Sequence, residues 1–362
     1  KILIRTNGDL KVGIGHLFRM KNLIKNFPKK KIIFILDYHN EVIKKILKKK
    51  CIFLYNPKQK FKSQRDDAQK VKKIIKKFKT DLIILDDYRF DINWEKHFYG
   101  NVKIAVFDDN NKKKHKCDFL IDSKWAGDST HERYKNLLNK NAIKLLGPKY
   151  AIIKKDIINK PINKKTFNIM FYIGGAGDFS LYKKFIINFA NSFKNYKKCK
   201  IIVIKGPYSK NSLYLNSKLK NYSNLKIVED SLDLSNTLNN TDLYLGVASS
   251  IIYELNKRNI PSILFSVNEN QKNSLEFFND LGFHFLINQK DISNQDTKVI
   301  NLVKCIFKNY SRIKKLNKNK IIIDKNGGKR IYNILSRKKK FNKKKKLPSL
   351  YSRVFFNKKD GF

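Results

Sequence analysis

His16 lies in a glycine-rich turn within the stretch NGDLKVGIGHLFRM. The apolar run KILI before this turn predicts a strand and the residues after it predict a helix, so His16 falls at the start of that helix. Gly13 and Gly15 let the backbone turn tightly and approach a ligand closely. A helix N-terminus favours neutral imidazole, which can accept a proton. We therefore predict that His16 acts as a general base; the alternative is a capping or packing histidine.

Two stretches in the second half combine small residues with the end of a strand, which favours phosphate binding. FYIGGAGD places Gly174 and Gly175 after a predicted strand, and LGVASSIIYE places Ser249 and Ser250 between a strand and a helix. Backbone N–H groups at such turns can hold a diphosphate. Glu254, one helical turn after Ser250, can accept hydrogen bonds from ribose hydroxyls.

Two amides follow a further predicted strand, PSILFSV. Asn270 and Gln271 lie in the stretch NENQKN and suit the hydroxyls of a sugar. The glycine spacing at the first turn is not GxGxxG, so we do not expect a dinucleotide, and no cofactor is predicted.

Acidic pairs end two predicted strands of the first half. LDDY contains Asp86 and Asp87, and FDDN contains Asp108 and Asp109. Such pairs suit either a metal ion or hydrogen bonds to a sugar or to backbone. No third carboxylate or histidine follows at a ligand spacing, so we favour hydrogen bonding.

A parallel sheet is the scaffold that these residues need. Apolar runs such as KIIFILD, DLIILDD and VKIAVFDD alternate with helical patterns such as residues 67–77, which predicts βαβ units. The polar stretch at residues 154–165 interrupts the alternation, and a second series follows with FNIMFYIGG, KIIVIKG and PSILFSV. We predict an α/β protein of two doubly wound, Rossmann-like domains facing a cleft. The first, residues 1–155, carries the histidine, and the second is residues 166–335.

The net charge of +49 does not by itself predict a nucleic-acid partner. Ten of the 79 basic residues of this 362-residue chain are arginine, and the lysines are spread along the whole sequence. Nucleic-acid-binding proteins favour arginine and gather their charge on one face. We therefore interpret the lysines as solvated surface and expect no nucleic-acid partner; weak attraction to anionic membranes or polymers is the alternative.

Cysteine usage and hydropathy point to the cytoplasm. The four cysteines, Cys51, Cys117, Cys199 and Cys305, are far apart and form no CxxC pattern, so neither a zinc site nor a disulfide framework is expected. No apolar run reaches the roughly 18 residues of a transmembrane helix.

The C-terminal residues 338–362 differ in character from the rest. A lysine-rich run is followed by Tyr351, Phe355 and Phe356, and we expect a disordered tail. Weak contact with anionic surfaces without stable membrane insertion is one role for it, and a truncated further domain is another interpretation.

Taken in order, these stretches resemble the UDP-sugar hydrolase family of pseudaminic acid biosynthesis, which is related to the GT-B glycosyltransferases. The resemblance covers about residues 1–285 and rests on IRTNGDLKVGIGHLFRM, LDDYRFDINWE, VFDDNNKKKHKCDFLID, LLGPKYAIIKKD and ASSIIYE. The chain has Asp87 and Arg89 where the family has histidine and glycine, and Asn7 where it has aspartate.

By this match His16 corresponds to the catalytic histidine of the family. Together with the residues singled out above, the matched positions give a substrate-binding set of Arg5, Gly13, Gly15, Arg19, Tyr88, Asp109, Tyr150, Gly174, Gly175, Ser249, Ser250, Glu254, Asn270 and Gln271.

The resemblance implies a metal-independent hydrolase whose partner is a UDP-sugar. The family releases UDP and free sugar from UDP-2,4-diacetamido-2,4,6-trideoxy-β-L-altropyranose, a step towards nonulosonic acids of the pseudaminic type. Water attacks the anomeric carbon with inversion, with His16 as general base and the second domain binding UDP. We expect a cytoplasmic monomer. Two alternatives stay open, namely a GT-B glycosyltransferase that uses a UDP-sugar donor, and a non-catalytic protein that binds nucleotide sugars or anionic polymers.

Overall fold

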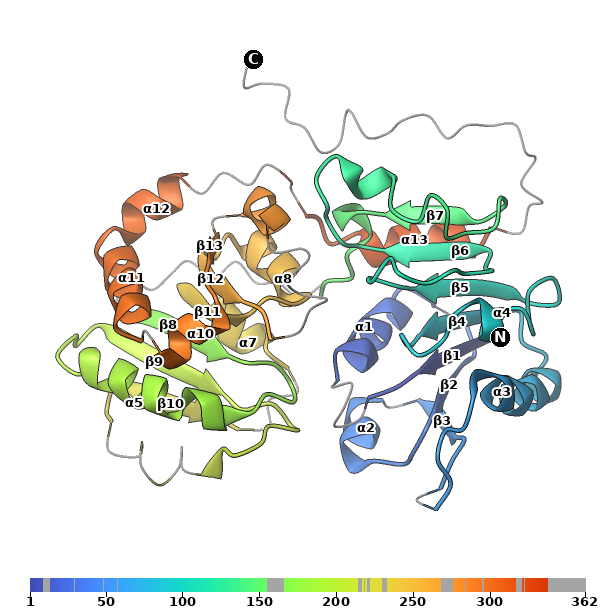
Figure 1. Ribbon diagram of the computed structural model, residues 1–362, viewed down its shortest axis with the longest axis horizontal. Coiled ribbons are helices and arrows are strands. Elements are labelled where there is room, and N and C mark those ends of the chain that lie inside the picture. The colour runs from blue at the N-terminus through green and yellow to red at the C-terminus, as the bar shows by residue number, and fades with distance from the viewer. Residues whose placement is uncertain are drawn as a thin grey trace, which may run out of the picture. The chain divides into compact units, whose positions relative to one another are not determined.

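The computed structural model divides the chain into two compact units, each described separately below (Figure 1). Unit 1 comprises Lys1–Ile153 and Lys325–Leu335, and unit 2 comprises Lys154–Asp324 with Ser336–Phe362. The structure describes residues 1–8, 14–28, 30–47, 49–56, 58–154, 166–213, 217, 219, 222–229, 233–267, 276–282, 284–294, 296–316, 321 and 323–337. The basic tail from residue 338 onward lies outside the described residues.

The described part of unit 1 is built on a seven-stranded parallel sheet in the order β3-β2-β1-β4-β5-β6-β7. Its inner strands are runs of Ile, Leu, Val and Phe that are buried along their length, as expected when helices cover both faces of a parallel sheet. The strands are β1 (Ile2–Thr6), β2 (Ile32–Leu36), β3 (Lys50–Phe53), β4 (Leu82–Asp86), β5 (Lys103–Phe107), β6 (Phe119–Asp122) and β7 (Ile143–Leu146).

Three of the helices of unit 1 begin at a side chain that caps their first turn. Asn40, Ser63 and Asp91 each accept a hydrogen bond from a backbone N–H at the start of the helix that follows. The helices are α1 (Gly15–Ile24), α2 (Glu41–Ile46), α3 (Gln64–Phe78), α4 (Ile92–Glu95), the 3-10 turns η1 (Ser129–His131) and η2 (Pro148–Tyr150), and α13 (Gly327–Leu335).

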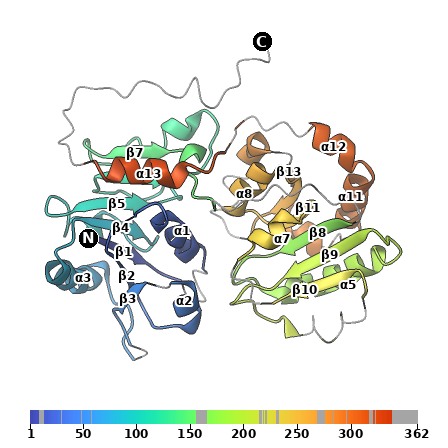
Figure 2. The same ribbon diagram turned by 180° about the vertical axis from the view of Figure 1, so that it is seen from behind.

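Helix α13 corrects the domain boundary expected from the sequence, which placed these residues in the second domain. Figures 1 and 2 both show it beside β7 of unit 1. Arg330 Nη1 donates to the carbonyl of Lys149 at 3.0 Å, and the rings of Tyr332 and Phe27 meet edge to face. A Cβ at Gly327 would lie 2.1 Å from the carbonyl oxygen of Ala151, so this close approach requires glycine.

The described part of unit 2 holds a six-stranded parallel sheet in the order β10-β9-β8-β11-β12-β13. Its strands are β8 (Phe167–Tyr172), β9 (Cys199–Ile204), β10 (Leu225–Val228), β11 (Leu243–Val247), β12 (Ser262–Phe265) and β13 (His284–Leu286). The helical segments are η3 (Phe179–Tyr182), α5 (Lys183–Ser192), α7 (Ser235–Asn239), α8 (Ile251–Arg258), η4 (Glu276–Leu281), α10 (Gln289–Asn294), α11 (Asp296–Lys308) and α12 (Tyr310–Leu316). Phe171, Phe185, Phe189 and Phe193 pack in sequence through its core.

These two sheets confirm the α/β class and the two doubly wound domains predicted from the alternation of apolar runs. The predicted strands of both halves correspond to observed ones, and residues 67–77 lie within α3. None of the helices in the described part of the chain is both long and apolar enough to cross a membrane.

His115 is a buried cation that ties together three segments of unit 1. Its Nδ1 lies 2.7 Å from Glu95 Oε1 in α4, and its Nε2 lies 3.5 Å from Asp108 Oδ2 after β5. Burial opposes protonation of an imidazole, but charge attraction to Asp108 and Glu95 and the hydrogen bond to Glu95 outweigh it and raise the pKa of His115 to about 9.

We predict that this contact stabilises unit 1 fully below about pH 6.5 and is lost as the pH rises through about 9, because a raised pKa stabilises the fold while the group is protonated. His115→Gln should therefore lower the free energy of unfolding near pH 6, by on the order of 2 kcal/mol, and matter much less above about pH 9. Trp94 and Trp125, the two tryptophans of the chain, both lie in unit 1, so tryptophan fluorescence during urea unfolding reports on this unit. A difference between the two proteins that does not change with pH would contradict the prediction.

Candidate active site

The candidate site lies where the strand order of unit 1 reverses. β1 and β4 are parallel neighbours, with Thr6 opposite Asp86 at their carboxyl ends. From β1 the strand order runs through β2 to β3 at one edge of the sheet, and through β4, β5 and β6 to β7 at the other. In open parallel sheets, ligands bind at such a reversal, beyond the carboxyl ends of the strands.

His16, the second residue of α1, is held by the carboxylate that ends β4. Its Nδ1 lies 2.6 Å from Asp86 Oδ1, and the side chain of Asp86 is 0% exposed. Because an ionised carboxylate can only accept, the shared proton lies on Nδ1 of His16. No described residue hydrogen-bonds Nε2, so this nitrogen keeps its lone pair for a proton from outside.

Arg19, one helical turn after His16, binds the acidic ends of two neighbouring strands. Its Nε donates to Asp86 Oδ2 at 3.0 Å, and its Nη1 donates to Asp109 Oδ2, after β5, at 2.6 Å. Burial works to raise the pKa of Asp86, but the charge of Arg19 and the hydrogen bonds from His16 and Arg19 outweigh it and hold that pKa below its usual value. For Asp109 the same opposition, with Arg19 as the strongest favourable charge, lowers the pKa to about 2.

Tyr88 completes the cluster. Its ring meets that of His16 edge to face with the centroids 4.6 Å apart, and its hydroxyl donates to Asp109 Oδ2. Burial and the neighbouring Asp109 raise the pKa of Tyr88 well above its usual value, so the phenol stays a donor. The predicted residues His16, Arg19, Tyr88 and Asp109 thus come together in one hydrogen-bonded group.

Arg5, which the sequence assigns to the substrate, instead lies inside unit 1. Its guanidinium is 0% exposed and binds Asp67 at 2.7 Å and Asp37 at 2.5 Å. Arg89 also binds Asp37, at 2.7 Å, and folds back onto Asp87 at 2.6 Å. These contacts give Arg5 a structural role inside unit 1.

The other first-half residues are less decisive. Gly15 opens α1, and a Cβ there would meet nothing within 4 Å, so crowding does not require glycine at this position. Tyr150 is half-buried in η2, where burial raises its pKa. Three predicted residues, Gly13, Asn270 and Gln271, lie outside the described residues.

Unit 2 has its own reversal of strand order, between β8 and β11. Gly174 follows β8 with a φ of 95°, a conformation that favours glycine, and Gly206 after β9 approaches Gly175 so closely that a Cβ would lie 2.5 Å from the Cα of Gly175. Ser249 and Ser250 are exposed at the start of α8. These are the turns expected to hold a diphosphate.

Glu254 is held by an arginine that the sequence analysis did not single out. Arg258, one turn further along α8, donates from Nη1 to Glu254 Oε2 at 2.7 Å and from Nε to Asn239 Oδ1 at 2.9 Å. The side chain of Arg258 is 4% exposed and that of Glu254 is 16% exposed. No described residue binds Glu254 Oε1, which is left as an acceptor.

Asp86 is the main residue whose role sequence reasoning missed. The acidic pair was noted, but the pairing with His16 depends on β4 lying next to β1, which a strand order of 3-2-1-4 in the first domain would have indicated. Among the described residues, no three His, Cys, Asp or Glu side chains are arranged to hold a metal ion.

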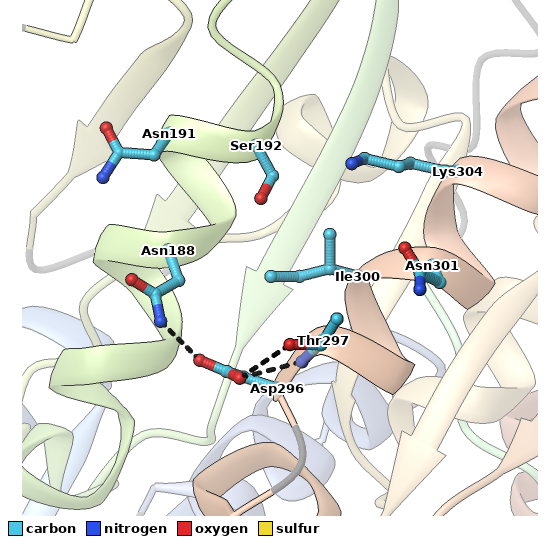
Figure 3. Close-up of a pocket in the computed structure, with 8 residues that line it drawn as sticks. All are labelled: Asn188, Asn191, Ser192, Asp296, Thr297, Ile300, Asn301 and Lys304. Carbon is cyan, nitrogen blue, oxygen red and sulfur yellow. Dashed lines mark hydrogen bonds between the residues drawn. The ribbon is translucent and has the colours of Figure 1, made fainter.

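A separate polar groove of about 230 Å³ lies between α5 and α11 of unit 2 (Figure 3). Figure 3 shows the Asn188 amide turned towards Asp296, to which it donates at 2.6 Å. The groove lies in the helical layer and contains none of the predicted site residues.

Comparison with known proteins identifies the architecture. No protein family model matches the sequence. Over 292 residues the chain is 27% identical to the uncharacterized protein MJ1062 of Methanocaldococcus jannaschii; the match covers 75% of this chain and 57% of that protein. The chain therefore spans little more than half the length of this relative.

Solved structures match over almost the whole chain. MurG of Acinetobacter baumannii has a TM-score of 0.61 at 11% identity, covering 92% of this chain and 99% of that one. The UDP-GlcNAc 2-epimerase of Methanocaldococcus jannaschii, in complex with UDP-GlcNAc and UDP, has a TM-score of 0.56 at 16% identity and covers 92% and 99%. The chain has the GT-B fold. In this GT-B chain the reversal in unit 1 carries His16, and the reversal in unit 2 carries the glycine and serine turns.

We predict that His16 is held as the Nδ1–H tautomer whenever it is neutral, because ionised Asp86 accepts that proton. Long-range ¹H–¹⁵N NMR correlations on histidine-labelled protein should show a protonated Nδ1 and an unprotonated Nε2, with the signal assigned by its loss in His16→Gln. Asp86→Asn should yield a mixture of tautomers, because a neutral amide accepts more weakly and can itself donate. The control Asp66→Asn, in the first turn of α3, should keep the wild-type pattern; a mixture already in the wild type would contradict the assignment.

Proposed function

We propose that the chain hydrolyses a UDP-activated amino-deoxy sugar at the anomeric C–O bond, releasing UDP and the free sugar in nonulosonic acid biosynthesis of the pseudaminic type. The observation that carries this proposal is the His16–Asp86 pair, with Nε2 of His16 left without a partner among the described residues. The GT-B fold, the likeness to a UDP-GlcNAc 2-epimerase in complex with UDP-GlcNAc and UDP, and the motif resemblance support the substrate class.

In the proposed reaction His16 is the general base. The oxygen of a water molecule forms a bond to the anomeric carbon while one of its protons passes to Nε2 of His16. The bond between that carbon and the β-phosphate oxygen breaks, and both electrons leave with UDP. Asp86 stabilises the imidazolium that forms, as the carboxylate of a catalytic triad does. Because UDP departs as a stable anion, the step needs charge stabilisation more than a strong acid.

Unit 2 would bind the UDP part of the substrate. The turns at Gly174–Gly175 and Ser249–Ser250 lie beyond neighbouring strands, and their backbone N–H groups suit phosphate oxygens. Glu254 Oε1 would accept a ribose hydroxyl while Arg258 holds Oε2. The backbone N–H groups of these turns would meet the charge of the diphosphate.

A glycosyltransferase of the same fold is the alternative, with an acceptor hydroxyl in place of water and the same histidine as base. Nothing in the geometry of His16 favours one nucleophile over the other, so the distinction belongs to the assay. A protein that only binds nucleotide sugars would leave the Asp86-oriented histidine without a use.

The test is UDP release from a panel of UDP-sugars in the presence of EDTA and without an acceptor, followed by NMR of the freed sugar. Wild type should turn over. His16→Ala should lose at least about a hundredfold in kcat, as expected when a general base is removed, and Asp86→Asn should lose about tenfold or more. Asp66→Asn should match wild type.

Three results would reject this assignment. Hydrolysis by His16→Ala near the wild-type rate would remove the base. UDP release that requires an added acceptor would make the chain a transferase. Activity that is lost with EDTA and restored by Mg²⁺ would show a metal-dependent reaction.

A separate prediction concerns the ribose contact of Glu254. Glu254→Ala should weaken UDP binding by about tenfold in calorimetry, because a hydrogen bond to a charged acceptor is lost, yet it should barely change the affinity for 2′,3′-dideoxy-UDP. Arg258→Met should also weaken the binding of UDP more than that of the dideoxy analogue, since the carboxylate of Glu254 is no longer held in place. The exposed Glu132→Ala in unit 1 is the control. Equal weakening for UDP and the dideoxy analogue would remove the ribose role.

A further inference from the structure

Asp109 presents one carboxylate oxygen that unit 1 itself does not use. Its Oδ2 accepts two hydrogen bonds, from Arg19 Nη1 and from the hydroxyl of Tyr88. No described residue binds Oδ1, and 23% of the side chain is exposed. The two oxygens of this carboxylate therefore differ: one is fixed by the protein and the other is available to a ligand.

The backbone of Asp109 is fixed as well. Its carbonyl oxygen accepts from Lys124 Nζ at 3.1 Å and from Arg133 Nη2 at 3.1 Å, both beyond β6. Held at its carbonyl and at Oδ2, the residue has little freedom to turn Oδ1 away. Ordering an acceptor before the ligand arrives lowers the entropy that binding costs.

Asp109 and His16 belong to the same constellation. Arg19 binds Asp109 with Nη1 and Asp86 with Nε, and Asp86 in turn binds His16. One guanidinium therefore separates the free acceptor from the carboxylate that orients the proposed base. A ligand group bound at Oδ1 would belong to the sugar on which His16 acts.

We propose that Asp109 Oδ1 selects the sugar by accepting a hydrogen bond from an N–H or O–H donor on its ring. This inference rests on the proposed function and deepens it by naming a property of the substrate. The preferred sugars carry a donor at the position facing Asp109, such as the N–H of an acetamido group. Sugars with an acceptor or a carboxylate at that position are rejected, because two acceptors would face each other without a proton between them.

The test compares UDP-2,4-diacetamido-2,4,6-trideoxy-β-L-altropyranose with analogues that each lack one donor. In two of them an acetoxy group replaces an acetamido group, exchanging one N–H for an oxygen of similar shape, and in a third the ring hydroxyl is replaced by hydrogen. Both kcat/KM and the binding constant are measured. Wild type should disfavour one of these analogues by about tenfold or more, and which analogue it is identifies the donor as N–H or O–H.

Asp109→Asn is the informative variant. The donors of Arg19 and Tyr88 should hold the amide oxygen at the place of Oδ2, which leaves the NH₂ group at the place of Oδ1. An acceptor thus becomes a donor of the same shape, and the discrimination against that analogue should fall to within about twofold or reverse. The control is Asp128→Asn on an exposed turn of the same unit. If Asp109 had only a structural role, the variant would have a lower kcat/KM for all substrates, and the ratio of kcat/KM between substrate and analogue would not change.

The outcomes separate this inference from the proposed function. Hydrolysis that depends on His16 but shows no discrimination among the analogues in the wild type, or the same discrimination in Asp109→Asn, overturns the inference alone. Binding that discriminates through Asp109 without hydrolysis overturns the proposed reaction and retains the inference. Absence of both binding preference and hydrolysis overturns both. The kcat/KM ratios of the wild type alone can overturn the inference, so the test stays decisive even if Asp109→Asn folds poorly.

Discussion

The guanidinium of Arg19 is the cation on which the candidate site depends. Two carboxylates, Asp86 and Asp109, end neighbouring parallel strands and would repel each other in a poorly solvated environment. Arg19 lies between them and lowers the pKa of both, so both stay ionised. Ionised Asp86 decides which nitrogen of His16 carries a proton. Without Arg19, burial would favour protonation of Asp86, and a protonated Asp86 could no longer hold the proton on Nδ1 of His16.

Unit 1 also contains a second ion-pair network. Asp37 is bound by both Arg5 and Arg89, and Arg89 also binds Asp87. Asp87 and Arg89 are two of the positions at which the chain departs from the motif that it resembles. Since the two side chains bind each other, the two departures amount to one physical change. Removing Arg89 alone would leave the buried carboxylate of Asp87 without this partner, which links the two residues.

The sequence could predict what depends on local order. Alternating apolar runs specify strands and helices, and the carboxyl end of a strand is where a glycine turn with His16 becomes informative. The partners of a side chain depend instead on which strands lie next to each other. The Asp86–His16 pair joins residues 70 positions apart, and the same limitation hid the burial of Arg5. Helix α13 was misassigned because its apolar face fits either unit equally well in a linear pattern; the steric fit of Gly327 against Ala151 became evident in three dimensions.

The return of α13 to unit 1 has a consequence for the order in which the chain is made. Unit 1 begins with residue 1, but its last helix is encoded after the segment Lys154–Asp324 that forms most of unit 2. A ribosome therefore releases the whole sheet of unit 2 before Lys325–Leu335 emerges. Until then the surface of unit 1 at Phe27 and Lys149, which α13 contacts, stays uncovered. Because domains fold as units during synthesis, unit 1 can complete its fold only after the sheet of unit 2 has been made.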